Sequence, residues 1–182
     1  EVDVSDEDEI GGPGFWCNQL RFAREGRPNA KFTIAELEAW LLSIFDQSAV
    51  FPELWPLVTL MDAENMLCRP NQADTMADRL GRHLLAMWFN VVSERLPADT
   101  VLGHLCPGDE EPPMNMDPTM TVEALIAAAE ADLLAGADDE VLEFWLDVVD
   151  FVNNASLPGT GGCDDEFVRR TATRGRHGNH RP

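Results

Sequence analysis

Residues 73–96, ADTMADRLGRHLLAMWFNVVSERL, repeat large apolar side chains at intervals of three and four positions. The repeating set is Met76, Leu80, Leu84, Met87, Val91 and Val92. Asp78, Arg82 and Glu94 fall outside it. This spacing predicts a long amphipathic helix, despite the helix propensity lost at Gly81. Pro97 follows its end, so we expect a central helix over about 73–96.

Four further segments carry helical signals, at 33–47, 62–68, 121–134 and 138–153. The first has the capping-box pattern of Thr33 and Glu36, and its apolar stripe is Ile34, Leu37, Leu41, Ile44 and Phe45. The other N-cap candidates are Thr121 and Asp138 or Asp139, and Gly136 can end the third segment. The chain lacks the alternation typical of strands. These patterns predict an all-α fold, an irregular bundle of four to six helices around the central one.

The same reading divides the chain into three parts. Residues 1–13 form an acidic extended arm, residues 14–157 a single helical domain, and residues 158–182 a tail that is rich first in glycine and then in arginine. Within the domain, 97–120 contains five prolines and predicts a long irregular loop. Because loops of this length are uncommon unless functional, tethered or disordered, it is one candidate contact surface.

Charge limits the possible partners. The chain of 182 residues has 33 acidic residues against 13 lysines and arginines, a formal net charge of -20. Such a charge repels nucleic-acid backbones and anionic lipid. No apolar run is long enough for a transmembrane helix. We therefore expect a protein partner or a homo-oligomer, with no nucleic acid and no membrane span.

The four cysteines are widely spaced: Cys17, Cys68, Cys106 and Cys163. Their spacing matches no zinc knuckle or thioredoxin motif. An even number at wide spacing favours two disulfides and an oxidising compartment, with buried free thiols as the alternative. The three possible pairings stay open.

The stretch GGPGFWCNQL, residues 11–20, places aromatic side chains directly behind a flexible glycine and proline run. Either it is a surface that meets a partner, or it plugs the helix bundle. We favour the second. Phe15 and Trp16 are then expected to insert into the helix bundle, with Trp16 mostly buried. Cys17 is expected to link this stretch to another segment through a disulfide, and Asn18 to satisfy nearby backbone groups.

The end of the chain has the opposite charge. From Arg169 onward it contains five arginines and no acid. A disordered tail is one interpretation. The other is a basic tail that docks on an acidic neighbour or on its own domain, with Arg169, Arg170, Arg174 and Arg176 as the candidate contacts.

The sequence carries no clear catalytic or cofactor motif. The DDE clusters at 138–140 and 164–166 could bind calcium, although helix capping and surface charge explain them more simply. His83 and Met87 could serve as haem ligands but lie on the same helix face. Exposed tryptophans could stack on a glycan, whereas their helical spacing favours the core. We therefore expect no catalytic residue, no required cofactor and no metal site.

Several short motifs resemble a domain of secreted bacterial proteins that opens with a signature such as GYWKNH or GFWSNK. They are GFWCN at 14–18, ENM at 64–66, RLGRHLLAMWFNVV at 79–92 and TVEALIAAAEADLLAG at 121–136. The signature positions are Gly14, Phe15, Trp16, Asn18, Asn65, Met66, Leu84, Leu85, Asn90 and Val91. This chain departs from the pattern at Cys17, Gln19, Ser93 and Glu94. The resemblance implies a helical domain of an exported protein and supplies no catalytic residue.

The sequence thus predicts a non-enzymatic, exported structural or interaction domain, an accessory component of an extracytoplasmic assembly in the periplasm, on the cell surface or outside the cell. The alternatives are a secreted domain that binds calcium or a glycan, a catalytic domain and, least favoured, a haem-containing redox subunit.

Overall fold

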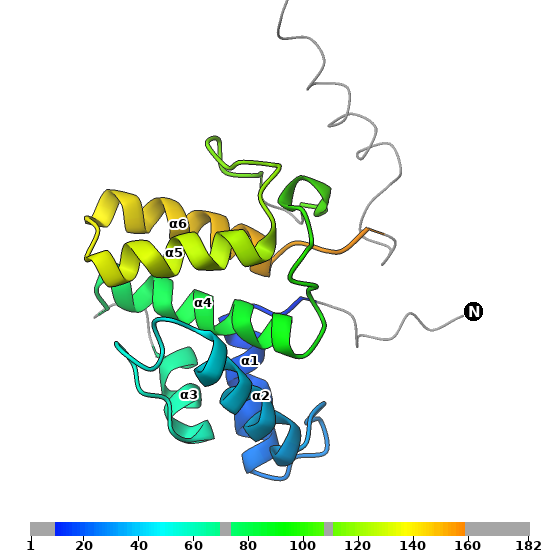
Figure 1. The fold of residues 1–182 in the computed structure, drawn as a ribbon. Helices are drawn as coiled ribbons and strands as arrows, with labels where there is room; N and C mark the ends of the chain where they lie inside the picture. Colours follow the sequence, from blue (N-terminus) through cyan, green and yellow to red (C-terminus); the bar gives the residue numbers. More distant parts are fainter. Residues whose placement is uncertain (1–9, 70–73, 108–110, 159–182) are drawn as a thin grey trace, which may run out of the picture.

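The computed structural model describes residues 10–69, 74–107 and 111–158 (Figure 1). In these ranges the chain forms six α-helices and one short 3-10 helix. They are α1 (Pro13–Arg24), α2 (Ile34–Gln47), α3 (Leu60–Leu67), α4 (Met76–Val92), η2 (Leu102–His104), α5 (Val122–Ala135) and α6 (Asp139–Asn153). The only β-pairing in the described ranges is two isolated bridges. The predicted all-α class is confirmed.

Side-chain caps determine where most helices begin. Thr33 forms the predicted capping box with Glu36, and the pairs Thr59 with Asp62 and Thr75 with Asp78 form two more. The predicted caps of the last two helices are also present. Thr121 accepts from the Ala124 amide, and Asp138 accepts from the Val141 amide. Gly136 ends α5 with a left-handed φ of 67°, as a C-terminal glycine does.

Helix α1 was not predicted from the sequence. Pro13 opens it without needing a backbone donor, and Arg21 and Arg24 occupy its last turn, where positive charge is favourable. Its buried face is short, because only Trp16, Gln19, Leu20 and Ala23 are buried. The preceding glycine and proline run therefore obscured a helix whose local start and stop signals were present.

Helix α4 is the centre of the fold, as predicted, but it is shorter than 73–96. Figure 1 shows it between two layers, with α5 and α6 on one side and α1, α2 and α3 on the other. The Thr75 cap sets its start. At its end Glu94 adopts a positive φ of 62°, and the Leu96 amide turns back to donate to the Asn90 carbonyl. Leu96 itself is fully buried.

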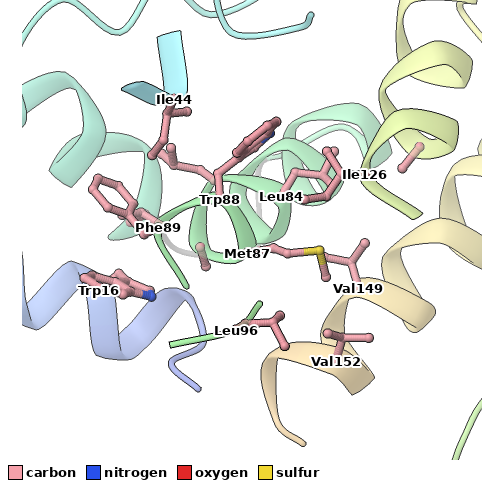
Figure 2. Close-up of a cluster of buried hydrophobic side chains, with 14 of the residues drawn as sticks. Trp16, Ile44, Leu84, Met87, Trp88, Phe89, Leu96, Ile126, Val149 and Val152 are labelled. Atoms are coloured by element: carbon pink, nitrogen blue, oxygen red, sulfur yellow. The ribbon is translucent and has the colours of Figure 1, made fainter. Parts of the chain in front are cut away.

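The core surrounds α4 on both sides. Figure 2 shows Met87 directed toward Val149 and Val152 of α6, while Trp16 of α1 lies beside Phe89 on the other side. Residues 84–90 are all buried, so α4 has no solvent face in its middle. Gly81 is explained by this packing, because a Cβ atom there would lie 2.5 Å from the ring of Trp55.

In its described parts, 97–107 and 111–120, the predicted loop has no regular structure besides η2, and it is attached to the domain. Leu102, Leu105 and Cys106 are buried. The Cys106 backbone pairs with Ser156, and Val101 pairs with Thr121. The first of these parts therefore contributes to the hydrophobic core.

The predicted boundary between the acidic arm and the domain is wrong by several residues. Residues 1–9 lie outside the described part, but Ile10 and Gly11 are buried and Pro13 begins α1. The Gly11 amide donates to Asn90 Oδ1 at 2.9 Å, and the Gly11 carbonyl accepts from Asn90 Nδ2 at 2.9 Å. The end of the expected arm thus belongs to the domain. At the other terminus, residues 159–182 lie outside the described residues.

Helices α1 and α3 are joined by a partly buried ion cluster. Glu64 of α3 is buried and accepts from Arg24 Nε at 2.8 Å and from Arg21 Nε at 3.3 Å. The hydrogen bond from Arg24 is the main cause that lowers the pKa of Glu64, and Arg21 adds to it. The cluster therefore stabilises the fold only while Glu64 is ionised.

We expect Glu64→Gln to lower the free energy of unfolding by about 1–2 kcal/mol at pH 7, because both arginines remain partly solvated. Since the folded pKa lies below the unfolded value, this contribution is complete above the unfolded pKa of about 4.3. It is lost as the pH falls through the folded value. Urea unfolding of both proteins from pH 7 to pH 3 should therefore give converging stabilities. Glu143→Gln, on exposed α6 surface, is the control, and a pH-independent Glu64 difference would contradict the assignment.

Candidate interaction surface

The structure gathers part of the predicted signature in the core rather than on a surface. Trp16, Leu84, Leu85 and Asn90 are fully buried. Phe15, Met66 and Val91 are half-buried, whereas Gly14, Asn18 and Asn65 are exposed. The predicted burial of Trp16 is confirmed. The signature region therefore mainly builds the junction of α1 with α4.

Asn90 performs the role expected of Asn18. Its Oδ1 atom accepts from the Trp16 indole nitrogen at 3.0 Å and from the Gly11 amide. Its Nδ2 atom donates to the Gly11 carbonyl and to Asn153 Oδ1, the latter at 3.2 Å. Asn18 instead lies exposed on α1. One buried amide thus attaches the start of the described chain to α4 and α6 with all of its main polar groups satisfied.

Cys17 and Cys68 form a disulfide between α1 and the end of α3, with a Cα–Cα distance of 5.2 Å. This confirms the predicted disulfide link from Cys17 to another segment. Cys106 is also disulfide-bonded, and the described part has no free cysteine. Cys163 lies outside the described residues, as do the candidate contacts Arg169, Arg170, Arg174 and Arg176.

A second buried carboxylate, Glu130 of α5, fixes the end of α2. Its Oε1 atom accepts from Ser48 Oγ at 2.6 Å and from Trp88 Nε1 at 2.8 Å, and its Oε2 atom accepts from the Ala49 amide at 2.8 Å. All three hydrogen-bond donors belong to the same domain. This arrangement explains a buried acid without invoking catalysis.

His83 and Met87, the potential haem ligands, have other contacts. Met87 is fully buried in the core. His83 Nδ1 lies 3.1 Å from Asp150 Oδ1, and His83 is the main cause that lowers the pKa of the Asp150 carboxyl. Within 10–69, 74–107 and 111–158, no group of three or more His, Cys, Asp or Glu side chains is placed to hold a metal ion. Asp138 caps α6, and the cluster at 164–166 lies outside these ranges.

An apolar groove of about 450 Å³ lies beside α2. One wall is two turns of that helix, with Glu38, Leu41, Leu42 and Phe45, and the other is residues 57–59 together with Leu60, the first residue of α3. Leu41, Leu57 and Leu60 are buried and form its floor. Sequence reasoning placed Ile34 and Phe45 in a buried stripe, but Ile34 is exposed and Phe45 is half-buried.

Most of the large exposed apolar side chains belong to the stretch of chain that builds this groove, and two of them line it. The described residues contain seven of them, and five fall between positions 34 and 61: Ile34, Leu42, Leu54, Val58 and Met61. Leu42 is 64% exposed on one rim and Val58 is 79% exposed on the other. Scattered apolar side chains are normal on protein surfaces, but exposed apolar side chains on both rims of a groove lined by buried leucines are typical of an interaction site.

Helix α2 carries exposed as well as buried apolar side chains. Leu37, Leu41 and Ile44 are buried, whereas Ile34, at the start of the helix, and Leu42 are exposed. A single amphipathic stripe would have satisfied the fold, so the outer apolar residues have no role in the described core. The sequence signal that could have indicated an exposed apolar surface is the apolar content of α2, which is greater than one buried face requires.

No match was found for this chain among models of known protein families, among curated proteins or among solved structures. Among the described residues, no helix has the length and apolar character needed to cross a membrane.

Proposed function

We propose that this protein is a non-enzymatic interaction domain of an exported assembly, and that it binds a segment of another protein in the groove between α2 and residues 57–60. The observation that carries the proposal is the pair of exposed apolar side chains, Leu42 and Val58, on the two rims of a groove lined by buried leucines. Covering Leu42 and Val58 would remove from water the apolar area that the isolated domain leaves exposed.

Export is part of the same proposal. The disulfide between Cys17 and Cys68 fits an oxidising compartment, where such bonds persist. The resemblance of the Trp16 and Asn90 regions to the secreted bacterial domain points in the same direction. These two observations support a location in the periplasm, on the cell surface or outside the cell.

A glycan or calcium site is supported less well by the groove. Its polar lining consists of Glu38 and Thr59, and Thr59 is occupied in its capping box with Asp62. Sugar binding needs several convergent polar groups as well as an apolar platform. A protein segment that brings apolar anchors satisfies the same surface with fewer polar contacts.

The proposal predicts site-specific capture. A photoreactive amino acid at position 42 or 58 of the full chain, expressed in its native cells, should crosslink to one common peptide segment. The same group at Leu134, an exposed leucine of α5, should not. A synthetic copy of the captured segment should then bind the purified protein. Leu42→Asp should weaken that binding at least tenfold, because burying one leucine contributes about 1.5–3 kcal/mol.

Leu134→Asp is the matched control for this experiment, since it makes the same change at a site that is also partly exposed. Both variants should retain the unfolding midpoint of the parent protein. Unrelated segments captured at 42 and 58, or equal affinities for the two aspartate variants, would contradict the proposed surface.

A further inference from the structure

We infer that the segment bound in the groove is a basic amphipathic helix, with lysines or arginines about two turns apart on either side of large apolar residues. This inference rests on the proposed function and specifies the chemistry of the partner. It follows from the juxtaposition of the apolar groove with carboxylates along α2 that no described cation pairs with.

The first step is the charge of the segment that builds the groove. From Phe32 to Cys68 the chain has six acidic residues and no lysine, arginine or histidine. Glu64 is neutralised by Arg21 and Arg24, and Glu36 and Asp62 complete capping boxes. Glu38, Asp46 and Glu53 remain exposed, and no described cation pairs with them.

The second step is the spacing of these carboxylates. Glu38, Leu42 and Asp46 are four residues apart in turn, so they lie along one side of α2. At a rise of 1.5 Å per residue, the two acids are separated by about 12 Å along the helix axis. The apolar rim at Leu42 lies midway between them. A partner helix laid along α2 would meet this pattern with basic residues about eight positions apart.

Charge and apolar content distinguish the possible occupants of the groove. A second copy of this chain also carries a net charge of -20, so its approach to an acidic groove is electrostatically unfavourable. Anionic lipid is disfavoured for the same reason. The chain's own segment from Arg169 onward has the right charge, but its nearest large apolar side chains, Phe167 and Val168, directly follow the acidic residues 164–166, so this tail does not alternate basic and apolar residues as an amphipathic helix would. A basic amphipathic helix of another protein satisfies both requirements.

The inference is tested with synthetic peptides and the full-length protein. The probe is a 15-residue amphipathic helix of leucine and lysine, and a peptide with glutamate in place of lysine is its control. We expect the lysine peptide to bind and the glutamate peptide to bind at least tenfold more weakly. Glu38→Gln/Asp46→Asn should weaken binding of the lysine peptide about 5- to 20-fold at low salt. The effect should shrink as salt is raised.

The matched control is Glu143→Gln/Asp147→Asn, which removes two exposed charges from α6 and should leave the affinity unchanged. If Leu42→Asp weakens binding while Glu38→Gln/Asp46→Asn does not, and both peptides bind equally, the basic partner is wrong and the apolar docking surface stands. If neither the Leu42 variant nor the acidic-residue variant changes binding, the groove is not the site and both proposals fail.

Two further outcomes would assign the groove to another occupant. Glutamate substitutions at Arg169, Arg170, Arg174 and Arg176 of the full chain should leave lysine-peptide binding within twofold. A marked gain in affinity would show that the chain's own tail competes for the groove and would overturn the inference. Sedimentation should show no self-association that Leu42→Asp abolishes, since such a dimer would identify a second copy as the occupant.

Discussion

Trp16→Ala is expected to lower the free energy of unfolding by about 3–5 kcal/mol, the range for removing a large aromatic side chain from a core. Trp16 is fully buried. Its ring stacks on Phe89 at a centroid distance of 5.0 Å and on Phe32 at 5.3 Å, so it lies between two aromatic rings. Because whole domains are stable by only about 5–15 kcal/mol, this one change removes a large share of the total. Chemical unfolding followed by circular dichroism measures it.

Two variants separate the causes of this loss. Trp16→Phe keeps an aromatic ring but removes the indole N–H that donates to Asn90, and should cost about 1–2 kcal/mol. Trp145→Ala removes a half-buried tryptophan of α6 that donates to Asp132, and should cost less than Trp16→Ala. Equal losses at positions 16 and 145 would show that Trp16 is not the central attachment of α1.

The sequence predicted those parts of the fold that depend on local signals. The capping box of Thr33 with Glu36, the cap at Thr121 and the glycine at 136 each act within four residues, so their consequences could be inferred without tertiary information. The periodicity of 73–96 likewise located α4. The sequence did not predict the residue at which α4 ends, because the turn at Glu94 depends on Leu96 entering the core.

The roles of buried polar groups depend on contacts between distant residues. Asn90 joins Gly11, 79 positions earlier, and Glu130 joins Ser48, 82 positions earlier. Neither pairing has a sequence signature, because an asparagine or a glutamate in a helix is usually assigned to its polar face. The expectation that Asn18 would perform the first role reflects the same limit, since the sequence shows a polar group near a buried segment but not the partner it reaches.

The candidate groove was missed for a related reason. Periodicity identifies which residues of α2 are apolar, but not whether enough neighbours exist to cover them. Ile34 and Leu42 are both apolar, yet no described element covers them. The negative charge of residues 32–68 is evident from the sequence. That Glu38 lies beside the exposed side chain of Leu42 at the groove is evident only from the structure.

The double variant Cys17→Ser/Cys68→Ser should lower the free energy of unfolding by roughly 4 kcal/mol, from the loop entropy that a crosslink of this length removes from the unfolded chain. The two cysteines are 51 positions apart, and the loop they close contains α2, the groove and α3. Opening it should therefore weaken peptide binding as well as stability. Urea unfolding under oxidising conditions gives the first quantity, and titration with the lysine peptide gives the second.

Reductant alone is not an adequate substitute for this variant, because Cys106 is also disulfide-bonded. Comparing the parent and the double variant with and without dithiothreitol separates the two contributions. The parent should lose at least as much stability on reduction as the substitutions remove, and the variant should lose only the remainder. A substitution cost below about 1 kcal/mol would mean that the ion cluster of Glu64 with Arg21 and Arg24 already holds α1 against α3. The disulfide would then contribute little to the stability of the fold.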